Sequence, residues 1–223
     1  MNNFSLIFRL IPLELLNTLY MVFISAFFSF LIGLPLGIFL YLTNNERLCP
    51  SVWIHRLLEM IVNIGRSIPF AILIVAIIPF TRFLVGTSIG TTASIVPLTV
   101  AAAPFMARIV EGALKEVGGG VVQAAIAMGA STLDVVLKVL LPEALPTLVR
   151  GGTLTLVTLV GYSALAGLVG GGGLGKVAIQ YGYHRFNGVL MGVTLIILVL
   201  LVECIQKIGN KIAIQLEKKR GLI

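Results

Sequence analysis

Long apolar stretches separated by short polar ones dominate this chain. A membrane-spanning helix needs about 20 mainly apolar residues. Five stretches meet that requirement, at 15–43, 57–80, 84–107, 151–172 and 186–206. Gly33, Pro35 and Gly37 are expected to bend the first helix, and Glu59 and Arg66 interrupt the second. The pattern therefore predicts an all-α integral membrane protein with five transmembrane helices.

The one long polar segment runs from Arg108 to Arg150, between the third and fourth apolar stretches. It holds eight of the 25 charged residues. Hydrocarbon cannot satisfy the backbone groups of such a segment, so we place it outside the membrane. We find no internal repeat and no low-complexity tail. A single transmembrane domain over residues 1–223 is expected, with a loop at about 108–150.

Composition supports lipid as the solvent. The 223 residues are 58% hydrophobic and 11% charged, with a mean hydropathy of +1.06, whereas soluble domains are about 25% charged. The first apolar stretch carries no charge from Leu15 to Asn45, which is longer than the apolar core of a cleavable signal peptide. Cys49 and Cys204 form no CxxC pair, so we expect neither a metal site nor a disulfide framework.

The positions of Lys and Arg predict the orientation. With the long loop inside, 11 basic residues face the cytoplasm and four face outward, while Arg66 stays within the membrane. The outer four are Arg9, Arg82, Lys176 and Arg185. Cytoplasmic loops carry an excess of Lys and Arg. We therefore predict an external N-terminus and a cytoplasmic C-terminus, and the net charge of +7 requires no nucleic-acid partner.

Within the long loop, the segment from Gln123 to Pro146 reads QAAIAMGASTLDVVLKVLLPEALP. Val121, Ala124, Ala125 and Met128 recur at i, i+3, i+4 and i+7, the spacing of one helical face. Small alanine side chains let such a helix approach a groove in another protein closely. An amphipathic helix packed on its own protein is the alternative.

A second helix is predicted to follow at once. Gly129 permits a sharp redirection of the backbone, where a Cβ atom would be strained. Ser131 and Asp134 have the spacing of a capping box. The helix they begin is expected to end near Pro142.

This spacing resembles the cytoplasmic EAA loop of ABC importer permeases: Glu-Ala-Ala, three residues, Gly, nine residues, Ile, one residue, Leu-Pro. Gln123 replaces the usual Glu, and Val139 replaces the usual Ile. The resemblance implies that the first helix is the coupling helix, which docks into an ATPase subunit. The coupling residues that it implies are Gln123, Ala124, Ala125, Met128, Gly129, Val139, Leu141 and Pro142.

The resemblance covers nearly the whole chain. Residues 63–73, 79–90, 95–114 and 159–175 resemble the permeases of methionine importers, although 117–120 lacks an expected proline. The resemblance implies a homodimer in the bacterial inner membrane, with the pathway between the two copies. It also implies two ATP-binding cassette subunits that hold ATP and magnesium, and an external lipoprotein that delivers D- or L-methionine for alternating access. No cofactor is expected in this chain.

Four residues are candidates for the translocation pathway or gate. An ionisable residue within a spanning helix is usually paired or faces water, which singles out Arg66. The fourth apolar stretch is glycine-rich and places Tyr162 and Ser163 beside Leu165. A polar pair there is equally compatible with hydrogen bonds to a neighbouring helix. For Arg66, a structural role at a helix end or subunit interface remains equally open.

The glycine-rich run matches the residue spacing of a phosphate-binding loop. Gly170, Gly175 and Lys176 fit G-x-x-x-x-G-K, but Val177 stands where magnesium binding needs Ser or Thr. No strand precedes the run, and the predicted topology places it outside the cell. We interpret it as a flexible external hairpin or gate element, so the chain itself is not an enzyme.

Four other functions are alternatives to a methionine permease. A permease for another amino acid or a short peptide would have the same scaffold. A secondary transporter or channel would need coupling charges near the midplane, where only Arg66 is available. A membrane enzyme would need a cluster of His, Asp and Glu, and no such cluster or metal site is visible. A structural membrane subunit is the remaining alternative.

Overall fold

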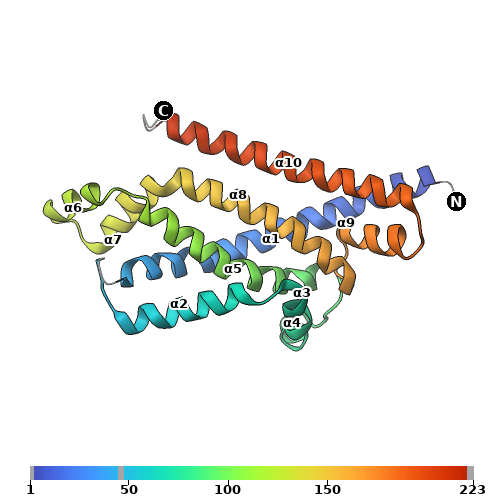
Figure 1. The fold of residues 1–223 in the computed structure, drawn as a ribbon, viewed down its shortest axis with the longest axis horizontal. Helices are drawn as coiled ribbons and strands as arrows, with labels where there is room; N and C mark the ends of the chain where they lie inside the picture. The colour runs from blue at the N-terminus through green and yellow to red at the C-terminus, as the bar shows by residue number, and fades with distance from the viewer. Residues whose placement is uncertain (1–2, 45–47, 220–223) are drawn as a thin grey trace. The chain divides into compact units, whose positions relative to one another are not determined.

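The computed structural model describes residues 3–44 and 48–219, which form helices and short connections with no strand (Figure 1). The α-helices are α1 (Asn3–Thr43), α2 (Val52–Ser67), α3 (Phe70–Ala76), α4 (Ile78–Val85), α5 (Thr91–Lys115), α6 (Gly119–Ala127), α7 (Thr132–Asp134), α8 (Leu141–Ala166), α9 (Gly173–Lys176) and α10 (Gly188–Lys219). Two π-helical segments, Val135–Leu140 and Val177–Tyr183, and a 3₁₀ turn, Gly167–Val169, connect some of them.

Four helical stretches are long and apolar enough to cross a membrane, at Leu6–Thr43, Thr91–Lys115, Thr132–Val169 and Gly188–Lys219. The broken pair α2 and α3 makes a fifth when it is counted as one span. Pro69 separates the two halves, and a proline disfavours helical backbone at the residue before it. The predicted all-α membrane fold with five spans is therefore confirmed, with one span broken.

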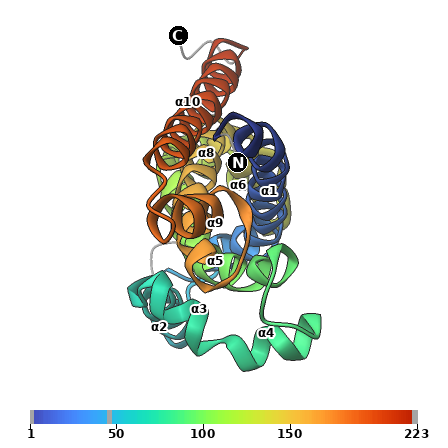
Figure 2. The ribbon, with the colours of Figure 1, turned by 90° about the vertical axis from the view of Figure 1, so that its right-hand side faces the viewer.

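Several predicted boundaries were wrong. The first helix begins at Asn3 rather than at 15, because the polar residues near its start do not interrupt it. The predicted span at 84–107 joined the end of α4 to α5, which are separated by a turn containing Gly86 and Gly90 at positive φ. Figure 2 shows α3 and α4 as two short consecutive helices. The helix expected to end near Pro142 instead continues into α8.

The chain forms two compact units, each assembled from several segments. Unit 1 comprises residues 1–28, 68–102 and 155–206, and unit 2 comprises residues 29–67, 103–154 and 207–223. Both therefore draw on α1, α5, α8 and α10. The expectation of a single domain over the whole chain remains a prediction.

In unit 1, two clusters of buried side chains form the core. One centres on Met21, Val22, Leu98 and Leu159, and the other contains Leu174 and Leu190. Burial of each such side chain stabilises the fold by about 1.5–3 kcal/mol. These clusters join the N-terminal part of α1 to parts of α5, α8 and α10.

In unit 2, the largest cluster joins the C-terminal part of α1 to the end of α5 and to the long loop. Gly33 and Gly37 face α5, where a Cβ atom on Gly37 would lie 2.5 Å from the carbonyl oxygen of Ala107. These glycines were expected to bend α1. Their observed role is to let the two helices approach closely, and α1 continues through them.

Candidate functional site

The predicted coupling loop begins with α6, which ends in a Schellman motif. The amide of Ala130 donates to the carbonyl of Ala125 (3.1 Å), and the amide of Gly129 donates to that of Ile126 (2.9 Å). Gly129 has φ +82° and no atom within 4 Å of an added Cβ. The glycine is therefore required by backbone conformation and not by crowding, which confirms the predicted redirection.

The second helix of the loop begins with the N-cap half of the predicted capping box, and the carboxylate of Asp134 also accepts from the Ser131 hydroxyl. The hydroxyl of Ser131 accepts a hydrogen bond from the amide of Asp134 (3.2 Å). The carboxylate of Asp134 pairs with the ammonium of Lys138 (2.5 Å). Hydrogen bonds from Lys138 and then Ser131 lower the pKa of Asp134, which lies in the polar loop before the span predicted at 151–172, to about 2. The carboxylate therefore stays ionised and supports the helix start.

Pro142 does not end that helix. It lies in the first turn of α8, directly after the π-helical segment Val135–Leu140. A π-helical turn shifts the hydrogen-bonding register, which accommodates the missing amide proton of a proline. Val139 and Leu141 pack against the unit 2 core, and Pro142 is partly buried.

The structure divides the predicted stripe of α6. Ala125 is 5% exposed and packs with Val122 in the unit 2 core, whereas Met128 is 83% exposed. Val121 and Ala124 are also exposed. At 100° per residue, Ala125 lies on the edge of the stripe nearest Val122. The four residues lie on one arc of the helix, as the spacing predicts, but Ala125 at the edge of that arc is buried in the core, and its role in coupling remains a prediction.

Gln123 is exposed on the same helix. The loop also exposes apolar residues outside the predicted coupling set: Ile126 (46%), Leu133 (67%) and Leu137 (53%). The i, i+4 spacing of Leu133 and Leu137 was the available signal. If the loop lies outside the membrane, as the sequence predicts, this gathering of exposed apolar side chains is typical of a surface that binds a protein partner. Figure 1 shows α6 and α7 close together in this loop.

The pathway candidates in unit 1 have different surroundings. The ring of Tyr162 stacks on Phe70, with centroids 4.6 Å apart and planes 5° apart. Ser163 is 2% exposed, and its hydroxyl donates to the carbonyl of Val160 (2.7 Å). Leu165 is 39% exposed. Leu165 is therefore accessible from outside the unit, while Ser163 makes a local helical hydrogen bond.

Arg66 lies in unit 2, in the last turn of α2, and is exposed. The break at Pro69 follows directly. A cation near a helix C-terminus interacts favourably with the helix dipole, which agrees with the helix-end alternative. Glu59 pairs with Arg108 (3.8 Å) and lies 3.9 Å from His55.

The glycine-rich run is a packed elbow and not the flexible hairpin that we expected. The carboxylate of Glu14, on α1, accepts a hydrogen bond from the amide of Gly173 (2.8 Å) and lies 3.4 Å from the ammonium of Lys176. The hydroxyl of Thr18 accepts from the amide of Leu174 (2.8 Å). The amides that a phosphate would need therefore bind a side chain of the chain itself.

Close packing explains the density of glycines in this elbow. A Cβ atom on Gly171 would lie 2.3 Å from the hydroxyl oxygen of Ser94, and one on Gly175 would lie 2.4 Å from the carbonyl oxygen of Ala164. Gly172 and Gly173 have φ of +87° and +74°. Sterics and backbone conformation both exclude larger residues here.

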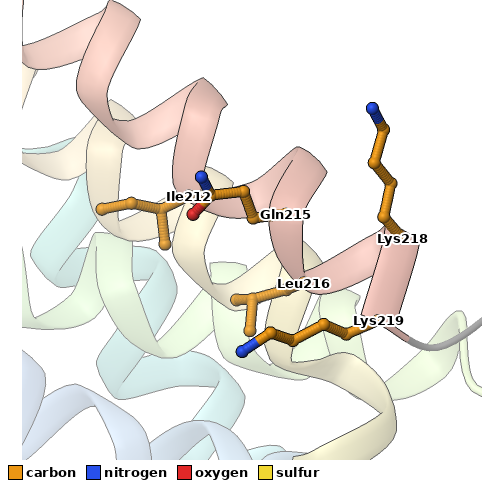
Figure 3. A pocket seen from close by; sticks show the side chains of 5 residues that line it. All are labelled: Ile212, Gln215, Leu216, Lys218 and Lys219. Atoms are coloured by element: carbon orange, nitrogen blue, oxygen red, sulfur yellow. The ribbon is translucent and has the colours of Figure 1, made fainter.

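Two hollows lie away from these residues. In unit 1, a hollow of about 290 Å³ between α8 and α10 is lined by Gly161, Ala164, Val202 and Glu203, among others. In unit 2, a hollow of about 430 Å³ is formed by the last turns of α10 alone. There, Lys219 extends back toward Leu216, and Lys218 points away (Figure 3). Neither has the convergent polar groups typical of a small-molecule site.

Comparison with known proteins agrees with the geometry. A family model described as "Binding-protein-dependent transport system inner membrane component" matches residues 33–211. The chain is 56% identical over 194 residues to the probable D-methionine transport system permease protein MetI of Vibrio cholerae serotype O1, which covers 87% of this chain and 86% of that protein. It is 58% identical over 151 residues to the D-methionine transport system permease protein MetI of Escherichia coli K12, with 68% and 70% covered.

Solved structures agree as well. A native crystal form of the MetNI methionine ABC transporter, in an inward-facing conformation, matches with a TM-score of 0.93 and 51% identity over 97% of this chain and 99% of that one. An amino acid ABC transporter at 17% identity matches with a TM-score of 0.73. At that identity, the second match shows the fold alone.

Proposed function

Because the chain belongs to the family of binding-protein-dependent transport system inner membrane components, we propose that it is the permease subunit of an ATP-driven methionine importer. Its relatives are named for D-methionine transport. The chain provides the membrane pathway, and a separate subunit hydrolyses ATP. The observation that carries this proposal is the outward apolar face of α6, on a helix whose other face is anchored.

The docking surface for the ATPase consists of Val121, Ala124 and Met128, extended by Leu133 and Leu137. Met128 is 83% exposed, and burying a methionine side chain contributes about 1.5–3 kcal/mol. Val122 and Ala125 hold the opposite side of α6 in the unit 2 core. A displacement of the docked face is therefore transmitted to α5 through packed side chains and is not lost in a flexible loop.

The working assembly is a homodimer with two ATP-binding cassette subunits, which bind ATP and magnesium, and an external binding lipoprotein that supplies methionine. The pathway lies between the two copies. Closure of the ATPase subunits opens it outward, and hydrolysis resets it. Leu165 and Tyr162 are proposed as its lining, and Arg66 acts at its edge or at a helix end.

The orientation in the inner membrane follows from charge. Unit 1 contains the four basic residues predicted outside, and unit 2 contains the basic residues predicted inside. The positive-inside rule assigns the more basic unit to the cytoplasm. We therefore propose that the N-terminus is external, that the C-terminus is cytoplasmic and that the α6 surface faces the cytoplasm.

Uptake by the reconstituted complex tests this function. Proteoliposomes containing this chain, its ATPase subunit and the binding protein should accumulate labelled D- or L-methionine when ATP is supplied. Met128→Asp should reduce uptake at least tenfold, because a charge replaces a buried apolar contact, whereas Met128→Leu should keep it. If the complex took up a different amino acid instead of methionine, the proposed permease function would stand and the proposed substrate would be wrong.

A further inference from the structure

Unit 2 contains a buried carboxylate held between two cations. Glu111, on α5, is 1% exposed. One of its oxygens accepts from Nη1 of Arg108 (2.7 Å), and the other accepts from Nζ of Lys115 (2.6 Å). All three residues belong to α5, so these contacts alone connect no two helices. They do hold the guanidinium of Arg108 in one orientation.

The second nitrogen of that guanidinium connects α5 to α2. Nη2 of Arg108 donates to the side-chain oxygen of Asn63 (2.7 Å) and lies 3.8 Å from Glu59. A planar guanidinium can hold partners on two helices at once because its donors have a fixed geometry. Arg108 therefore forms a polar bridge between α2 and α5, which we call the Arg108 bridge.

The rest of the contact between these helices is small. Val62 is the one residue of α2 recorded as buried in the described chain, where it packs with Leu40 and Ala107. Gly65 lies against Pro104, so that an added Cβ would be 2.6 Å from Cγ of the proline. This narrow apolar contact provides no polar link between the two helices, and the hydrophobic effect that stabilises it is non-directional. The Arg108 bridge adds a contact of fixed geometry between α2 and α5.

The bridge stands close to the coupling loop in the chain. Three residues separate the end of α5 at Lys115 from the start of α6 at Gly119. Val110 and Leu114 of α5 share the unit 2 core with Val122 and Ala125 of α6. A displacement of α6 therefore moves this end of α5.

From this arrangement we infer that Arg108 is a positioning residue that makes α2 move together with α5 when the coupling helix is displaced. The inference rests on the proposed function. Without the bridge, ATP hydrolysis would continue, but the movement of α6 would reach α2 only through the narrow apolar contact. The specific consequence is fewer methionine molecules transported per ATP hydrolysed.

Two substitutions at Asn63 test the bridge without disturbing Glu111. Asn63→Leu removes the hydrogen-bond acceptor on α2 and leaves the longer contact with Glu59 in place, whereas Asn63→Asp keeps an acceptor oxygen at this position. In proteoliposomes with the ATPase subunit and binding protein, Asn63→Leu should lower the methionine-to-ATP ratio about tenfold, the effect expected for loss of a hydrogen bond to a charged group. Hydrolysis itself should change less than about twofold, and Asn63→Asp should keep the ratio.

Lys115→Gln is the matched control, because it removes the other cation from Glu111 without touching α2. It should leave the methionine-to-ATP ratio unchanged. The inferred role of Arg108 is wrong if Asn63→Leu keeps the wild-type methionine-to-ATP ratio or lowers uptake and hydrolysis in proportion. It is also wrong if Lys115→Gln lowers the methionine-to-ATP ratio equally. Failure of the wild-type complex to transport methionine would overturn the proposed function instead.

Discussion

At the scale of single residues, backbone conformation at Gly129 decides whether the coupling loop forms its turn. An added Cβ atom would meet nothing within 4 Å, so the strain of the φ of +82° can be tested separately from crowding at that atom. Gly129→Val should cost about 1–3 kcal/mol and reduce ATPase-coupled uptake. Gly129→Asn should be tolerated, because asparagine adopts this region more readily. Uptake by the two variants in proteoliposomes measures the difference.

Glu14 provides a second test at this scale. Glu14→Ala would leave the buried amide of Gly173 without its acceptor, which should destabilise the protein by about 1–3 kcal/mol. Glu14→Gln keeps an acceptor oxygen and should lose less stability than Glu14→Ala. Thermal unfolding in detergent would measure the difference. Equal unfolding temperatures for the wild type and Glu14→Ala would show that the elbow does not depend on this carboxylate.

At the scale of elements, the two faces of α6 predict opposite consequences for adjacent alanines. Ala125→Trp should prevent folding or lower stability by several kcal/mol, because Ala125 is 5% exposed in the core and overpacking typically costs about 1–3 kcal/mol or more. Ala124→Trp should fold normally and weaken binding of the ATPase subunit. Unfolding temperature and co-purification of the ATPase separate the two. Similar behaviour of both variants would contradict the division of faces.

The sequence predicted the elements well where a local rule decided them. Five apolar stretches, the turn at Gly129 and the cap at Ser131 each follow from composition or from a single backbone requirement. It failed where tertiary context decided. Pro142 is a stop signal in isolation, yet the π-helical segment before it lets the helix continue.

The candidate site also depends on tertiary contacts that the sequence did not predict. The i, i+3, i+4 rule grouped Ala125 with three exposed residues, because periodicity fixes an arc of about 100° but not which edge of it is buried. The partner of the glycine-rich run, Glu14, is 159 residues distant in sequence. The Asn63 contact of Arg108 likewise spans 45 residues. No local pattern could have predicted either pairing.

At the scale of the whole molecule, the helices that contribute residues to both units bear on how a displacement of α6 is passed along the chain. Helices α1, α5, α8 and α10 contribute residues to both units without a break between them. The remaining span divides at residues 68–69, with α2 in unit 2 and α3 in unit 1. A broken span is free to respond differently from a continuous one, so α2 is the element for which an added link to α5 has the greatest consequence.

The orientation of the chain in the membrane is the last prediction, and docking of an ATPase subunit on α6 depends on it. We expect a cysteine at Phe186 (unit 1, 92% exposed) to react with a membrane-impermeant maleimide in intact cells. A cysteine at Leu133 (unit 2, 67% exposed) should react only after permeabilisation. Cys49 and Cys204 are both exposed and must first be replaced by serine and alanine. Labelling of Leu133→Cys from outside would place the α6 surface where no ATPase can dock, and the positive-inside assignment of unit 2 would be wrong.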